Sequence, residues 1–190
     1  DQGNYRCVVT GDCGIETSSS AALTVRTATA VTVHPAPLDL CPGAAAVFAV
    51  NAVGENLSYR WQRNSENLEN GGDISGALTD TLHIANVDSG DQGNYRCVVT
   101  GDCGIETSSS AALTVRTATA VIEHPDSLAL CDGHAAVLTV SAVGENLSYR
   151  WQRNGENLDN GGGISGATSD TLEIGSVSEG NEGIYRCVVT

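Results

Sequence analysis

Cysteine and histidine are the residues of this chain whose types can support metal binding, redox or nucleophilic chemistry. The 190 residues include seven cysteines and four histidines. Zinc sites place such ligands in close pairs: two cysteines with two to four residues between them, or two histidines with three to five. Neither kind of pair occurs here. His34 and His124 instead stand in matching His-Pro pairs, so the sequence predicts structural or surface roles for the histidines and no metal site.

Other motifs that carry catalysis are also missing from the sequence. No serine stands in a Gly-x-Ser-x-Gly context, and no glycine-rich run follows a phosphate-binding pattern. The acidic stretch Glu66–Asp73 offers oxygen ligands for calcium, but its second copy has Gly163 where Asp73 stands, and its spacing is not that of an EF-hand. We therefore expect a solvated turn there. The chain is predicted to have no catalytic residue, cofactor or small-molecule substrate, and not to be an enzyme.

The charge of the chain restricts its partners. It has 23 acidic residues against nine basic ones, a net charge of −14, and all nine basic residues are arginine. So acidic a chain repels nucleic acid and anionic membrane surfaces, and we expect no nucleic-acid partner. No apolar run approaches the roughly 18 residues that span a bilayer, so no membrane insertion is predicted.

The sequence contains an internal repeat, which sets the positions of the cysteines and histidines in the fold. Residues 1–31 recur unchanged as 91–121, and residues 32–100 return in edited form as 122–190, so the period is 90 residues. The chain starts in the middle of a repeat and without methionine. We therefore expect it to be a processed or excerpted piece.

Within the repeat, short alternating apolar segments predict β-strands and no helix. Turn signals rich in glycine, asparagine, aspartate and proline separate these segments every eight to twelve residues or so. About seven short strands in one repeat are typical of an antiparallel β-sandwich. The clearest expected strands are residues 45–53, 57–63, 81–87, 93–100 and 109–115.

One motif resembles a known family. Asp91-Gln-Gly-Asn-Tyr-Arg-Cys97, downstream of Trp61, looks like the start of strand F of an immunoglobulin domain. The resemblance implies that Tyr95 forms the tyrosine corner and that Cys97 packs against Trp61 in the core. It implies the same roles for the equivalents in the other copy, Trp151, Tyr185 and Cys187. The predicted fold class is all-β, with tandem immunoglobulin-like antiparallel β-sandwich domains similar to those of large secreted or surface proteins of bacteria.

This resemblance divides the chain into three parts. Residues 1–28 hold the last two strands, F and G, of one domain; residues 29–118 form a complete domain; residues 119–190 run from strand A to strand F of another and lack strand G. The linker at residues 116–121 is short and has no glycine or proline, so little hinging and a rod-like array are expected. Either the chain is a window on a longer one, which we favour, or residues 11–28 complete a neighbouring copy by strand addition.

The resemblance also bears on the cysteines of strand F. Strand B of an immunoglobulin domain normally supplies the cysteine that pairs with strand F, and here Val50 and Val140 occupy that position. Cys97 and Cys187 therefore lack their ordinary partner. The favoured interpretation is a buried free thiol that packs as a small hydrophobic residue.

Two further cysteines per repeat fall in the expected turns of this fold. Cys41 is in the A–B turn and Cys103 in the F–G turn, with Cys131 and Cys13 as their relatives. In the resembled fold these turns lie at opposite ends of a domain, too far apart for one disulfide. We hypothesise inter-domain disulfides, from Cys41 to the F–G cysteine of the following domain and from Cys103 to the A–B cysteine of the preceding one. Disulfides imply export, and the alternative is free thiols in a reducing compartment.

Together these features predict a structural repeat of an extracellular filament or cell-surface stalk, with further copies of the same repeat, joined head to tail, as partners. The main alternative is an adhesin shaft or ligand-binding module, and a third is an accessory array on a secreted enzyme. Aromatic residues are only 4% of the chain and fall in strand positions, which opposes a binding rim. Asn56-Leu-Ser58 and Asn146-Leu-Ser148 are possible N-glycosylation sites.

Overall fold

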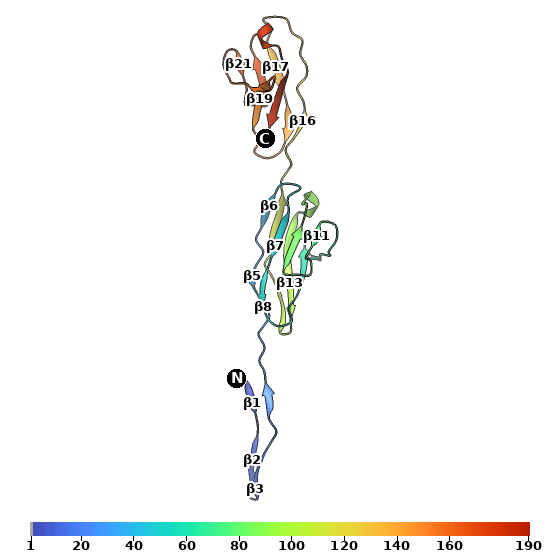
Figure 1. Ribbon diagram of the computed structural model, residues 1–190, viewed down its shortest axis with the longest axis vertical. Helices are drawn as coiled ribbons and strands as arrows, with labels where there is room; N and C mark the ends of the chain where they lie inside the picture. Colours follow the sequence, from blue (N-terminus) through green and yellow to red (C-terminus); the bar gives the residue numbers. More distant parts are fainter. Residues whose placement is uncertain (1) are drawn as a thin grey trace. The chain divides into compact units, whose positions relative to one another are not determined.

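The computed structural model describes residues 2–190 (Figure 1). Contacts within the chain divide these residues into two compact units. One unit contains residues 43–114 with the chain before Leu40, and the other contains residues 115–190 with residues 40–42. The helical segments of residues 2–190 are two single turns of 3-10 helix, η1 (Ser89–Asp91) and η2 (Glu179–Asn181). No helix in this part of the chain is long and apolar enough to cross a membrane. The predicted all-β class is confirmed.

The larger sheet of residues 29–118 is centred on β13 (Gly93–Gly101). This strand pairs antiparallel with β9 and β15, in a register that places Cys97 opposite Trp61. Side chains alternate along a strand, so Tyr95, Cys97 and Val99 all face the core. The sheet order is β10 (Glu66–Asn67), β9 (Ser58–Arg63), β13, β15 (Ala111–Val115) and β6 (Leu38–Leu40), with β14 (Gly104–Thr107) paired to β13.

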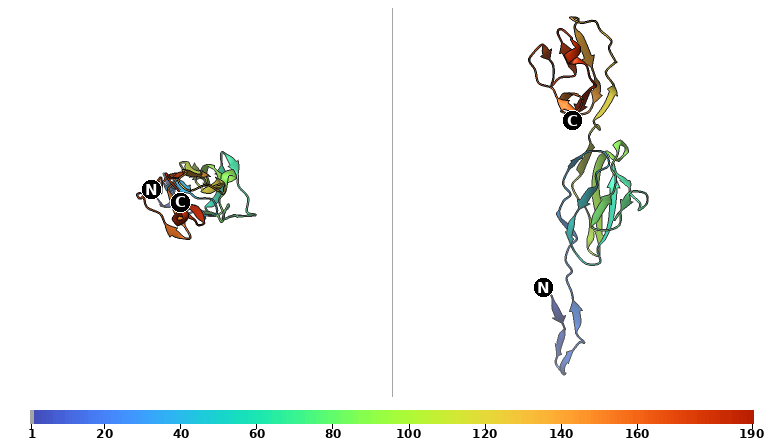
Figure 2. Two further views of the ribbon diagram at one scale, coloured as in Figure 1. Left: turned by 90° about the horizontal axis from the view of Figure 1, so that it is seen from above. Right: turned by 45° about the horizontal axis from the view of Figure 1, so that its top comes forward.

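A second layer of strands closes the core of this domain (Figure 2). Its centre is β12 (Thr81–Ile84), which pairs with β11 (Ile74–Ser75) and with β7 (Ala46–Ala49). β7 alternates buried and exposed residues, which is the pattern of a strand with one face on the core. The chain then passes through the buried Val50 into β8 (Asn51–Val53), which pairs with β5 (Ala30–Val33).

The strands of residues 2–28 form two-stranded pairs. β1 (Gly3–Tyr5) pairs with β4 (Ala21–Leu23), and β2 (Val8–Gly11) pairs with β3 (Gly14–Thr17). Every residue of these strands is exposed. The same sequence is packed in the complete domain, where Tyr95 is 0% exposed while its equivalent Tyr5 is 51% exposed. Burial therefore depends on the strands that face this segment and not on its own sequence.

The unit of residues 115–190 is built around Trp151. Its core residues are Leu138, Val140, Trp151, Ala167 and Leu172. Cys187 on β23 lies opposite Trp151 on β19, and among the described strands β23 pairs with β19 alone, so Tyr185 and Cys187 are only partly buried. The strands are β16 (Ala120–Glu123) with β18 (Ser141–Val143); β17 (Ala136–Thr139), β22 (Thr171–Ile174) and β21 (Ile164–Ser165); and β20 (Glu156–Asn157), β19 (Tyr149–Arg153) and β23 (Tyr185–Val189).

Candidate functional site

The tryptophans form the centre of each core. Trp61 has no exposed surface, and its indole N–H donates to the Thr79 carbonyl at 2.9 Å. Trp151 is equally buried and donates to the Ser169 carbonyl at the same distance. A buried indole N–H needs such a partner, because an unpaired donor in the core is costly. The two tryptophans therefore serve packing and stability.

The strand F cysteines lie in the same cores. Cys97 is a fully buried free thiol, and burial raises its pKa to about 11. Burial also raises the pKa of the partly buried Cys187. A thiol that stays protonated at neutral pH is a poor nucleophile and a poor metal ligand. Val50 and Val140, the residues in the strand B position, are buried as well.

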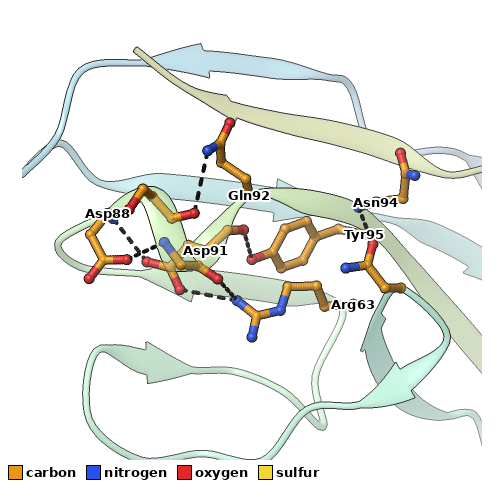
Figure 3. Close-up of polar contacts among 9 residues, drawn as sticks. Arg63, Asp88, Asp91, Gln92, Asn94 and Tyr95 are labelled. Atoms are coloured by element: carbon orange, nitrogen blue, oxygen red, sulfur yellow. Dashed lines mark hydrogen bonds and ion pairs between the residues drawn. The ribbon is translucent and has the colours of Figure 1, made fainter. Parts of the chain in front are cut away.

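Polar contacts hold the start of β13 (Figure 3). The Tyr95 hydroxyl donates to the Asp91 backbone carbonyl at 2.6 Å, and burial raises the pKa of this phenol. Arg63 donates to the Gly90 carbonyl at 2.7 Å and lies 3.4 Å from the Asp91 carboxylate. The same carboxylate accepts the Asp88 N–H at 3.0 Å, so one aspartate ties the η1 turn to β9.

Removing the Tyr95 hydroxyl should lower the free energy of unfolding of residues 29–118 by about 1–1.5 kcal/mol, because the ring remains but the Asp91 carbonyl loses its donor. Tyr185 makes an equivalent 2.6 Å bond to the Asn181 carbonyl but is only partly buried. Tyr185→Phe should therefore lower the free energy of unfolding of the unit of residues 115–190 by a smaller amount. Hydrogen exchange of the β13 and β23 amides measures both losses. Tyr5→Phe, at the exposed equivalent, is the control, and a loss of the same size there would contradict the role of the Tyr95 bond.

The four turn cysteines are exposed, and all seven cysteines of the chain are free. Cys103 lies in the hairpin between β13 and β14, and its carbonyl accepts the Thr29 N–H at 3.5 Å beside β5. Cys41 directly follows Leu40, whose carbonyl accepts the Arg116 N–H at 2.8 Å just past β15. Each of these cysteines is thus next to a segment that connects successive repeats. Cys13 and Cys131 are the equivalent residues of the other copies.

The acidic stretch at residues 66–73 uses its side chains within the turn. Asn70 Oδ1 accepts the Ala77 N–H at 2.8 Å, and Asp73 Oδ1 accepts from Asn86 Nδ2 at 3.0 Å. Across residues 2–190, no group of three or more histidine, cysteine, aspartate or glutamate side chains is placed to hold a metal ion. His34 Nδ1 accepts the Ser109 N–H at 3.1 Å, which is a structural contact.

One polar cluster joins residues that are far apart in the sequence. Arg26 forms ion pairs with Asp102 and with Glu55, the latter at 3.6 Å from Nε to Oε2. Asn56, an exposed residue with φ of 53°, donates from Nδ2 to Asp102 Oδ2 at 2.9 Å. The available sequence signal was the linker tetrapeptide Arg26-Thr-Ala-Thr29, which recurs after 90 residues. Glycan attachment at Asn56 and at Asn146, whose φ is also 53°, stays a prediction.

The two β-sandwiches, each with a buried tryptophan and a tyrosine corner, define tandem immunoglobulin domains. The immunoglobulin I-set domain family matches residues 29–115 and 119–190, and the chain belongs to this family. I-set domains of this kind are adhesion and structural modules, not enzymes. Neogenin of Rattus norvegicus is 30% identical over 99% of this chain, which covers 14% of neogenin. The muscle M-line assembly protein unc-89 of Caenorhabditis elegans is 28% identical over all of this chain, which covers 2% of that protein.

Solved structures share the fold. The N-terminal eight Ig domains of Down Syndrome Cell Adhesion Molecule align with a TM-score of 0.70 at 22% identity, over all of this chain and 29% of that one. The I-band fragment I67-I69 of titin aligns with a TM-score of 0.67 at 18% identity, over 87% of this chain and 60% of that one. The curated relatives named here are animal proteins, so they do not support the predicted bacterial source.

Proposed function

We propose that the chain is part of a structural array, a run of I-set domains in an extracellular filament or cell-surface stalk whose partners are further copies of the repeat joined head to tail. The 90-residue period carries this proposal, because the domain pattern recurs from strand A to strand F with the same buried tryptophan and the same tyrosine bond. Repetition of one domain supplies length and uniform mechanical properties.

Inter-domain disulfides are the proposed staples of this array. Cys41 would bond the F–G cysteine of the following domain, and Cys103 the A–B cysteine of the preceding one. The exposure of both thiols supports the pairing, as does their position beside Arg116 and Thr29, the residues at the ends of the connecting segments. Disulfides of this kind form in oxidising compartments, so the proposed staples require the extracellular or cell-surface location that is proposed with them.

Peptide mapping tests the staples in a chain extended after Thr190 by a copy of residues 101–116, which adds strand G and an F–G cysteine. After expression in an oxidising compartment and digestion without reductant, we expect a peptide that joins Cys41 to the added cysteine, and Cys41→Ser should abolish it. Cys97 should remain a thiol that alkylates only after unfolding. A peptide that joins Cys41 to Cys103 would overturn the staple model. Free thiols at both Cys41 and the added F–G cysteine would do the same.

An adhesin shaft or ligand-binding module is the second candidate. It is favoured by an exposed apolar side chain in the F–G hairpin, since Ile105 on β14 is 68% exposed. A screen of the chain against glycans and surface proteins separates the two candidates. A specific ligand with a Kd in the micromolar range would favour the binding module, and the structural proposal expects none.

A further inference from the structure

The arginine of the linker is held by two turns of the complete domain. Arg26 lies between β4 and β5, and its guanidinium is paired with Glu55 of the B–C turn and with Asp102 of the F–G turn. We propose that Glu55, Asn56 and Asp102, called here the linker seat, form a binding site for the guanidinium of the arginine that precedes each domain. The seat fixes the linker on the domain that follows it, independently of any disulfide.

The linker seat is preorganised by bonds between its own turns. The Asp102 N–H donates to the Glu55 carbonyl at 3.0 Å, which joins the F–G turn to the B–C turn. Asn56 Nδ2 donates to Asp102 Oδ2 at 2.9 Å and so orients the carboxylate. These contacts do not involve Arg26. The Asp102 carboxylate and the backbone of Glu55 are therefore positioned by the domain before the guanidinium binds.

Charge explains why the seat takes a cation. Glu55 and Asp102 project from adjoining turns of a chain whose net charge is −14, so their carboxylates repel each other unless a positive group lies between them. Arg26 supplies that group, and a planar guanidinium can contact two carboxylates at once. The Arg26 side chain is half-exposed, so salt should weaken the contact.

A second contact holds the other end of the linker. Thr29 is buried and is packed between two turn glycines. A Cβ at Gly101 would stand 2.5 Å from Thr29 Oγ1, and a Cβ at Gly54 would stand 3.2 Å from Thr29 Cα. A side chain at Gly101 would therefore displace Thr29 Oγ1, and one at Gly54 would press against the Thr29 backbone. With Arg26 and Thr29 both anchored on one domain, only Thr27 and Ala28 lie between the anchors.

The B–C turn part of this arrangement recurs in the unit of residues 115–190. The linker tetrapeptide is repeated as Arg116-Thr-Ala-Thr119. The Thr117 N–H donates to the Glu145 carboxylate at 3.4 Å, and Glu145 is the equivalent of Glu55. A Cβ at Gly144 would stand 3.1 Å from Thr119 Cα. The glutamate and the glycine of the B–C turn thus meet the linker in both units.

Backbone order parameters of the linker amides test the seat in the full 190-residue chain. At low salt, Thr27 and Ala28 should show order parameters near the ~0.85 of rigid backbone, and Arg26→Gln should lower them below about 0.6. Asp102→Asn should act in the same direction. The double variant should lose little more than either single variant, because the two residues form one interaction. Arg96→Gln is the matched control: it removes an arginine from β13, where Nε donates to Gln62, and should leave the linker unchanged.

Salt provides the second arm of this experiment. Raising the ionic strength to about 1 M shortens the screening length to about 3 Å, so the linker of the unmodified chain should become more mobile while that of Arg26→Gln should hardly change. Spectra of the β-strand amides verify that each variant is folded. An Arg26→Gln linker as rigid as that of the unmodified chain would overturn the proposal, and so would a linker whose order is insensitive to salt.

Discussion

Replacing Trp61 with alanine is expected to lower the free energy of unfolding of the complete domain by about 3–5 kcal/mol. The ring is fully buried, and its centroid lies 6.3 Å from that of Phe48. Its removal leaves a cavity in the centre of the sandwich and deprives the Thr79 carbonyl of its donor. Both effects act on the folded state, and a loss of this size is a large part of the stability of a single domain.

Urea unfolding followed by hydrogen exchange measures this loss for each unit separately. Trp151→Ala is the matched variant and should destabilise the unit of residues 115–190 alone, because each tryptophan hydrogen-bonds within its own unit. Trp61→Phe keeps an aromatic ring but removes the N–H donor, so its loss should be smaller than that of Trp61→Ala. Equal losses for Trp61→Phe and Trp61→Ala would show that the hydrogen bond and not the packing dominates. An unchanged unfolding midpoint for Trp61→Ala would contradict the central role of this side chain.

Contacts between residues that are close in the sequence could be predicted from their spacing along the chain. The Tyr95 bond reaches back four residues to Asp91, so one short motif contains both of its ends. The all-β class was predictable for a similar reason, since alternation and turn residues are properties of short segments. The packing of a segment cannot be predicted in this way, because it depends on which other strands face that segment. Residues 2–28 show this directly: their strands are exposed, although the same sequence is packed in the complete domain.

The linker seat could not be predicted from the sequence because its members meet only in the folded domain. Arg26 and Asp102 are 76 residues apart in the chain, and Asn56 and Asp102 are 46 apart. No periodicity or short motif brings such residues together. The proposed disulfide pairings are harder still to predict, because spacing locates the turns that carry cysteines but not the thiols that would face them. What the sequence does offer is the recurrence of an arginine at each linker, in a chain that has no lysine.

Val50→Cys is expected to raise the free energy of unfolding of the complete domain by about 2–4 kcal/mol, by creating the strand B to strand F disulfide that this domain lacks. Val50 and Cys97 are both buried. They stand in the positions that immunoglobulin domains generally use for the disulfide between strands B and F. Disulfide exchange needs a thiolate, and burial raises the pKa of Cys97 to about 11. The bond should therefore form during oxidative refolding and only slowly in the folded, reduced domain.

The pH dependence of stability gives an independent check on this variant. The Cys97 pKa is raised from 9.0 to about 11 by folding, so in the unmodified chain the unfolded state loses this proton first as pH rises. Its contribution to stability is complete below pH 9.0 and is lost as pH rises toward about 11. Once Cys97 is bonded to the new cysteine it has no proton to lose, so oxidised Val50→Cys should lack this decline. Cys97→Ala in the same background should remove both the decline and the gain in stability. Two free thiols at these positions after oxidative refolding would show that the two side chains do not meet.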